Sequence, residues 1–184
     1  MPLAALFRRP RHRAAALALY DAIVAQARQP AFFLGHGVPD TLDGRFELLA
    51  LHGFLVLHRL KGDRARCAGL AQELFDVMFT DVDRGLREMG VGDLSVGRHV
   101  KLMAKAFYGR IRSYERGLAA GEPALGEALR RNLYGTTAPG PNDLAALADY
   151  LRRSFDRLAA QPAENLLAGQ VGFAAPPGIG PALA

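Results

Sequence analysis

The chain has 184 residues, half of them hydrophobic, so it is long and apolar enough to fold as one globular domain without disulfides or metals. Its single cysteine, Cys67, excludes an intramolecular disulfide and a zinc site built from cysteines. The net charge of +5 comes from 20 arginines and three lysines against 18 acids, which excludes a strongly acidic, disordered protein.

Apolar residues recur at helical spacing along most of the chain, and no alternating strand pattern is present. The expected helices cover residues 11–29, 40–60, 63–89, 95–118, 123–134 and 142–161. The second of these is apolar nearly all round, which is typical of a helix in the middle of a bundle. The sequence therefore predicts an all-α, single-domain bundle of about six helices with flexible termini.

Capping residues define several of the expected helix ends. Asp40 or Asp43 is expected to cap the second helix, Ser95 or Asp93 the fourth, and Asn142 the sixth. Gly90 is expected just after the third helix, where glycine tolerates the left-handed conformation, and Pro123 in the first turn of the fifth. Leu17 is expected on the buried face of the first helix, and Met89 at the end of the apolar stripe of the third.

Composition divides the chain into three parts. Residues 1–12 are expected to form a basic N-terminal arm, because they contain arginines and no acid. Residues 13–168 are expected to form the helical domain. Residues 169–184 are rich in glycine and proline and are expected to be a disordered tail. No secretory signal and no membrane-spanning segment is expected.

No catalytic residue, cofactor site or metal site is predicted. The five histidines include no pair spaced three or four residues apart, so no helix presents two ligands on one face. The glycine string 90–97 lacks the order of a phosphate-binding loop and follows a helix, not a strand. No aromatic or recognition-helix motif supports sequence-specific binding of nucleic acid. We therefore expect no enzymatic activity.

Several charged, glycine-containing strings stand in a fixed order along the chain. They are GVPDTLDGRFE (37–47), LH (51–52), RL (59–60), DVDRGLREMGVGDLSVG (81–97), KLMAKAFYGR (101–110), Tyr114 and RNLY (131–134). Together they resemble the signature of the ubiquinol–cytochrome c chaperone family over about residues 30–135. The resemblance implies an α-helical, non-enzymatic chaperone that holds newly made cytochrome b for the assembly of respiratory complex III.

The resemblance also implies partners and a location. Newly made cytochrome b is the expected client, with the ribosome and a small companion protein as further partners. A bacterial chain of this type is expected in the cytoplasm, peripherally bound at the inner face of the plasma membrane. A helical module that binds RNA or the ribosome is the alternative, because the chain is basic, although we attribute that charge chiefly to codon bias.

An apolar groove with a charged rim suits a hydrophobic client, and charges of the signature strings are the candidates for that rim. The candidate residues are Asp40, Arg45, Glu47, Asp83, Arg84, Arg87, Glu88, Asp93, Lys101, Lys105 and Arg110. Lys101, Lys105 and Arg110 are expected to form a basic face. A purely structural role is equally compatible with the sequence: Arg45 could pair with Asp81 or Asp93 and lock the second helix to the turn that follows the third.

Overall fold

A computed structural model describes residues 12–135 and 137–178, and within these ranges the chain is all-α, with no strand. The elements are α1 (Arg13–Ala27), the π-helical turn η2 (Ala31–Gly35), α2 (Leu42–Gly62), α3 (Arg64–Glu88), α4 (Asp93–Ala120), α5 (Glu122–Leu129), the π-helical turn η3 (Arg130–Tyr134), α6 (Pro141–Ala160) and α7 (Ala163–Leu167). The prediction of an all-α bundle is confirmed, with α5 and η3 together forming the expected fifth helix. None of the described helices is both long enough and apolar enough to cross a bilayer.

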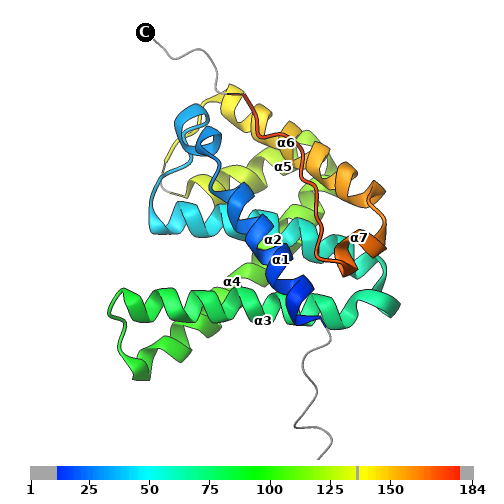
Figure 1. Cartoon of the computed structure of the whole chain (residues 1–184). Coiled ribbons are helices and arrows are strands. Elements are labelled where there is room, and N and C mark those ends of the chain that lie inside the picture. Colours follow the sequence, from blue (N-terminus) through cyan, green and yellow to red (C-terminus); the bar gives the residue numbers. More distant parts are fainter. Residues whose placement is uncertain (1–11, 136, 179–184) are drawn as a thin grey trace, which may run out of the picture.

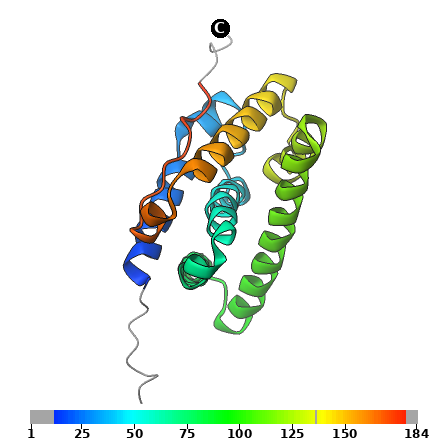
Figure 2. The ribbon, with the colours of Figure 1, turned by 90° about the vertical axis from the view of Figure 1, so that its right-hand side faces the viewer.

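Helix α2 lies at the centre of the bundle, as its all-round apolar sequence predicts. It contacts α1, α3, α4 and α6 (Figures 1 and 2). Eleven of its residues are buried, including His52, which is completely enclosed. Figure 2 shows α2 between α1 and α6 on one side and α4 on the other. Among the described elements, α4 also contacts α3 and α5.

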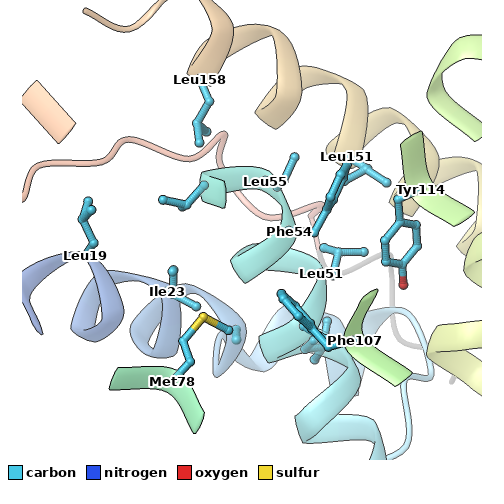
Figure 3. Packing of buried hydrophobic residues seen from close by; sticks show 14 of the residues in the cluster. Leu19, Ile23, Leu51, Phe54, Leu55, Met78, Phe107, Tyr114, Leu151 and Leu158 are labelled. Carbon is cyan, nitrogen blue, oxygen red and sulfur yellow. The ribbon is translucent and has the colours of Figure 1, made fainter. Parts of the chain in front are cut away.

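The core is one contiguous cluster that draws on every helix of the bundle. Figure 3 shows Phe54 of α2 near Tyr114 of α4, and both side chains, like Leu151 of α6, are completely buried. Two inward assignments are wrong, because Leu17 is 41% exposed and Met89 is 51% exposed. In α1, Leu19 is buried and Leu17 is not. Met89 follows the C-terminal end of α3, which extends beyond the bundle.

The predicted N-caps are wrong at three helices. Thr41 caps α2, since its hydroxyl oxygen accepts the amide N–H of Gly44 at 3.2 Å. Gly92 precedes α4, and Asp93 and Ser95 already belong to that helix. Gly140 precedes α6, where the Asp143 carboxylate accepts the amide N–H of Gly140 at 3.1 Å. In each case another residue takes the extended backbone conformation that a capping position requires.

Residues 169–178 are not disordered, which corrects the prediction for this part of the tail. They run extended beside α6, where side chains bind their backbone. The amide N–H of Ala174 donates to Ser154 Oγ at 3.3 Å, and Gln26 Nε2 of α1 donates to the Ala174 carbonyl at 3.1 Å. Phe173 also meets the His52 ring edge to face, with centroids 5.2 Å apart. Glycine and proline prevent a helix here but leave backbone groups for these polar side chains to bind.

The other terminal predictions fall outside the described residues. The basic arm lies on residues 1–12, of which only His12 is described, and the end of the predicted tail lies on residues 179–184.

Candidate functional site

The ends of α3 and α4 form a helical hairpin that extends beyond the rest of the bundle (Figure 1). Its turn is built on Gly90, which has a φ of +84° directly after the C-cap Met89. The Val91 N–H donates to the Leu86 carbonyl at 3.0 Å, and the Gly90 N–H donates to the Arg87 carbonyl at 2.9 Å. These two bonds define a Schellman motif, so the predicted role of Gly90 is confirmed.

Ion pairs close the hairpin across this turn. Arg87 binds Asp83 one turn back, at 2.7 Å between Nε and Oδ2, and it also binds Asp93 at the start of α4. Arg84 binds Asp81 and lies 3.9 Å from Glu88. Both pairs along α3 join residues one helical turn apart, and Arg87 additionally fixes the start of α4 relative to the end of α3.

Large apolar side chains are exposed on the hairpin. Leu94 is fully exposed, Leu102 is 55% exposed, and Met89 is 51% exposed. Leu86 and Val96 are buried here, yet they are not part of the contiguous core of the bundle. The hairpin thus has a small apolar interior of its own and an uncovered apolar surface beside it. Exposed apolar residues that gather in this way are typical of a protein-binding surface.

Aromatic rings join the hairpin to the bundle. Phe75 and Phe79 of α3 lie 4.5 Å apart between ring centroids. Across the helix pair, Phe79 meets Phe107 of α4 at 5.9 Å, and Phe75 stacks on Tyr108 at 5.5 Å. These contacts hold α3 and α4 together at the base of the hairpin, so its tip projects from a rigid support.

Glu47 and Arg110 do not belong to an exposed rim, which corrects their predicted place. They form a bidentate ion pair between α2 and α4, with the Glu47 side chain 9% exposed and the Arg110 side chain 22% exposed. Burial raises the pKa of the Glu47 carboxyl, an effect that the Arg110 guanidinium opposes. The predicted basic face therefore lacks Arg110, whose guanidinium also lies 5.8 Å from the Phe46 ring.

Asp40 and Arg45 pair with each other at the start of α2, at 2.6 Å between Oδ1 and Nε. The Arg45 guanidinium holds the pKa of the Asp40 carboxyl below its usual value. Both side chains are more than half exposed. The predicted lock between Arg45 and Asp81 or Asp93 is wrong, since Asp81 binds Tyr20 of α1 and Arg84, and Asp93 binds Arg87.

The structure therefore divides the candidate set into three groups. Asp40 and Arg45 form an exposed pair, Glu47 and Arg110 form an interior one, and the remaining charges gather on the hairpin. The hairpin group consists of Asp83, Arg84, Arg87, Glu88, Asp93, Lys101 and Lys105. The exposed apolar residues Met89, Leu94 and Leu102 lie on the same hairpin, and the sequence analysis predicted none of them as exposed. Leu94 carried a local signal, because it lies outside the apolar stripe of its own helix.

The two histidines of α2 have partners within the bundle. His52 is within 2.7 Å of both the Leu48 carbonyl and the Tyr150 hydroxyl, and burial lowers its pKa to about 4. His58 lies 3.0 Å from the Glu115 carboxylate. Among residues 12–135 and 137–178, no three potential metal ligands converge.

Comparisons with known proteins agree with this geometry. Residues 35–173 match the sequence profile of the family described as ubiquinol-cytochrome C chaperone. The chain belongs to the ubiquinol-cytochrome C chaperone family. The matched range includes all of α2 to α7 and the whole hairpin, so this membership covers the candidate site.

Individual relatives of the family are similar over most of this chain. Ubiquinol-cytochrome c reductase complex assembly factor 1 is 29% identical in both Mus musculus and Homo sapiens, over 83% of this chain. The chain spans about half the length of these two relatives, 52% and 51% respectively. A crystal structure of the Cbp3 homolog from Brucella abortus is 40% identical, with a TM-score of 0.81 over 95% of this chain and 97% of that one.

Proposed function

We propose that this member of the chaperone family binds newly made cytochrome b and supports the assembly of ubiquinol–cytochrome c reductase without catalysing a reaction. The observation that carries the proposal is the α3–α4 hairpin, where exposed apolar side chains and paired charges occur on the same two helix ends. The mouse and human relatives are named as assembly factors of this reductase complex, which supports the same role.

The chemistry of the hairpin fits a client that comes from a membrane. Apolar segments of such a client are exposed before assembly and gain from contact with Met89, Leu94 and Leu102. The surrounding carboxylates and guanidiniums keep this surface hydrated when it is empty and fix the register of a bound segment. Most of these charges are already paired with each other, so a client can bind the apolar centre without separating them.

The proposal also assigns a working place and further contacts to the chain. Cytochrome b is made and inserted at a membrane, so the chaperone would act peripherally at the inner face of the bacterial plasma membrane. The ribosome and a small companion protein are the other proposed contacts. An RNA- or ribosome-binding module remains the second candidate function, because the exposed arginines of α4 suit a polyanion.

Complementation of a strain that lacks the gene tests this function and its surface together. The test variant carries Met89→Ser, Leu94→Ser and Leu102→Ser, all at exposed positions where the substitutions leave the core intact. The matched control carries Leu17→Ser, Leu34→Ser and Leu42→Ser, which are also exposed but lie on other elements. The readout is the amount of assembled complex III and of its b-type haem.

We expect the deletion strain to lose complex III, and the wild-type chain and the control to restore it. The hairpin variant should accumulate as folded protein and fail to restore the complex. Normal complex III in the deletion strain would refute the proposed function. Full restoration by the hairpin variant would refute the proposed surface and leave the function open to another part of the chain.

A further inference from the structure

The outer side of α4 carries a row of five cations, of which Arg98, Arg112 and Arg116 lie outside the proposed client surface. They are Arg98, Lys101, Lys105, Arg112 and Arg116, and all five are exposed. At 100° per residue, these five positions fall within about 60° of one another around the helix axis, over a length of about 27 Å. We call these five residues the α4 cationic row.

The row has no acidic counterpart among the described residues. Elsewhere arginines are commonly paired, as Arg66 is with Glu164 and Arg153 with Asp149. The two acids of α4 are directed elsewhere, since Asp93 binds Arg87 and Glu115 binds Lys61 and His58. No member of the row lies within ion-pairing distance of a carboxylate in residues 12–135 or 137–178. Its positive potential is therefore available to a ligand.

A groove between α4 and α5 continues the row at one end. It has a volume of about 330 Å³, and three arginines line it: Arg112, Arg116 and Arg131. Small residues such as Gly109 and Ala128 form part of its lining. Arg131 is held in place by Ser113, whose Oγ accepts a hydrogen bond from Arg131 Nη2 at 2.6 Å. Glu127 also lines the groove, but its carboxylate is bound to Arg130. Convergent guanidiniums over small side chains suit a phosphate group.

Apolar side chains decide which polyanion fits. Leu94 and Leu102 project from the same side of α4 as the row, within about 40° of Arg98 around the helix axis. Exposed leucines gain nothing from the phosphates of RNA, but they leave water when a helix rests on a bilayer interface. An RNA-binding face would instead interleave aromatic rings for base stacking, and the neighbouring Tyr108 is already stacked on Phe75.

We propose that the outer side of α4 is a docking surface for anionic phospholipid: the cationic row and the α4–α5 groove bind headgroup phosphates, and Leu94 and Leu102 enter the interface. This inference rests on the proposed function in one respect: both require the chain to act at a membrane surface. It adds the surface that makes the contact and the lipid charge that the contact requires. Leu94 and Leu102 also belong to the proposed client surface, so lipid and client would contact these two leucines in turn and not together.

The test uses the full chain and vesicles of phosphatidylglycerol, with vesicles of phosphatidylcholine as the neutral comparison. The test variant carries Arg98→Gln, Arg112→Gln and Arg116→Gln, none of which belongs to the proposed client surface. The control carries Arg28→Gln, Arg64→Gln and Arg157→Gln, which remove the same charge from exposed positions on other elements. Both variants keep the basic N-terminus, so that any contribution from it cancels.

Each cation near an anionic surface changes binding about fivefold, so the test variant should partition about 100-fold more weakly than the wild type. The control should lose less than about fivefold, and phosphatidylcholine should bind none of the proteins. Equal losses in the two variants would overturn the proposal, because the contact would then depend on net charge alone. Tighter binding of labelled RNA than of vesicles, with the same dependence on the row, would assign the surface to RNA and overturn the lipid.

A fluorescent reporter tests the apolar part of the contact separately. The chain has no tryptophan, so Leu94→Trp provides a single reporter on the proposed surface and Leu34→Trp one elsewhere. Emission from the first should shift to the blue with anionic vesicles, and emission from the second should not. An unshifted signal at position 94 would overturn insertion. Because vesicles contain no client, failure here is distinct from failure of the proposed chaperone function.

Discussion

Glu47 and Arg110 join the central helix to α4 through a buried ion pair, and replacing Arg110 would leave a carboxylate enclosed without a partner. The perturbation is a double-mutant cycle with Arg110→Met, Glu47→Gln and the combination of both. This cycle measures whether Glu47 and Arg110, which the sequence analysis proposed as partner-binding residues, stabilise the fold through their ion pair.

The magnitude follows from the burial of the two side chains. Removing one partner of a buried ion pair costs about 3–5 kcal/mol. We expect Arg110→Met to lower the free energy of unfolding by about 3 kcal/mol, at the low end of this range. Glu47 is only 9% exposed, so its lone carboxylate is costly, but the carboxyl can bind a proton and become neutral. Glu47→Gln should cost about 2 kcal/mol, since Arg110 is 22% exposed and can reach water. The double variant should resemble Arg110→Met alone, which gives a coupling energy of about 2 kcal/mol.

Urea unfolding, followed by far-ultraviolet circular dichroism at neutral pH, measures each corner of the cycle. The same cycle at the exposed pair Asp40 and Arg45 serves as the control and should show no measurable coupling. A coupling energy below about 0.5 kcal/mol for Glu47 and Arg110 would refute a structural role for the pair.

Three further predictions concern stability. Burial lowers the pKa of His52 to about 4, so as the pH falls the unfolded chain binds a proton at this residue before the folded chain does. The contribution of His52 to the free energy of unfolding should therefore be complete above about pH 6.5 and decrease by about 3 kcal/mol as the pH drops toward 4. Urea titrations across this range should show a flatter profile for His52→Gln, and an unchanged profile would contradict this. Gly44→Ala should destabilise the fold by about 2 kcal/mol or more, because the added Cβ would lie 2.0 Å from the Pro39 carbonyl oxygen. Gly97→Ala should stabilise it by about 0.5–1 kcal/mol, because nothing lies within 4 Å of the added Cβ. Equal thermal stabilities of the two variants would contradict the packing described. Phe173→Ala should cost about 2 kcal/mol and expose residues 169–178 to proteases, and a protease-resistant segment would show that Phe173 does not hold it.

The helices could be predicted because their spacing is a local property of the sequence. Phe107 and Tyr114 are seven residues apart, so they return to the same side of α4, and both are completely buried. The turn at Gly90 could be predicted for the same reason, since its conformation depends on the residue itself. N-caps were less predictable, because Thr41 and the aspartates beside it are all good capping residues.

The candidate site could be predicted only in part, because its contacts combine near and distant residues. Asp83 and Arg87 are four residues apart on one helix, and their pair follows from the sequence. Glu47 and Arg110 are 63 residues apart, so nothing local to either one shows that they meet in the interior. The backbone of residues 169–178 likewise depends on Gln26 and Ser154, which a reading of its glycines and prolines does not include.

The exposure of apolar side chains on the hairpin was the property least predictable from the sequence. Met89 continues the apolar stripe of α3, and only the arrangement of the helices leaves it uncovered. The hairpin extends past the point where other helices could cover it, which periodicity along one helix cannot indicate.

Site-specific crosslinking to nascent cytochrome b tests the central claim most directly. A photoreactive residue would be placed at position 94 or 102 on the hairpin, and at position 34 or 42 as the control, in full-length chains of equal abundance. The account predicts that cytochrome b crosslinks to the hairpin positions and not to the controls. Crosslinks to cytochrome b from the control positions alone, or none from any position while complex III still depends on the gene, would contradict it.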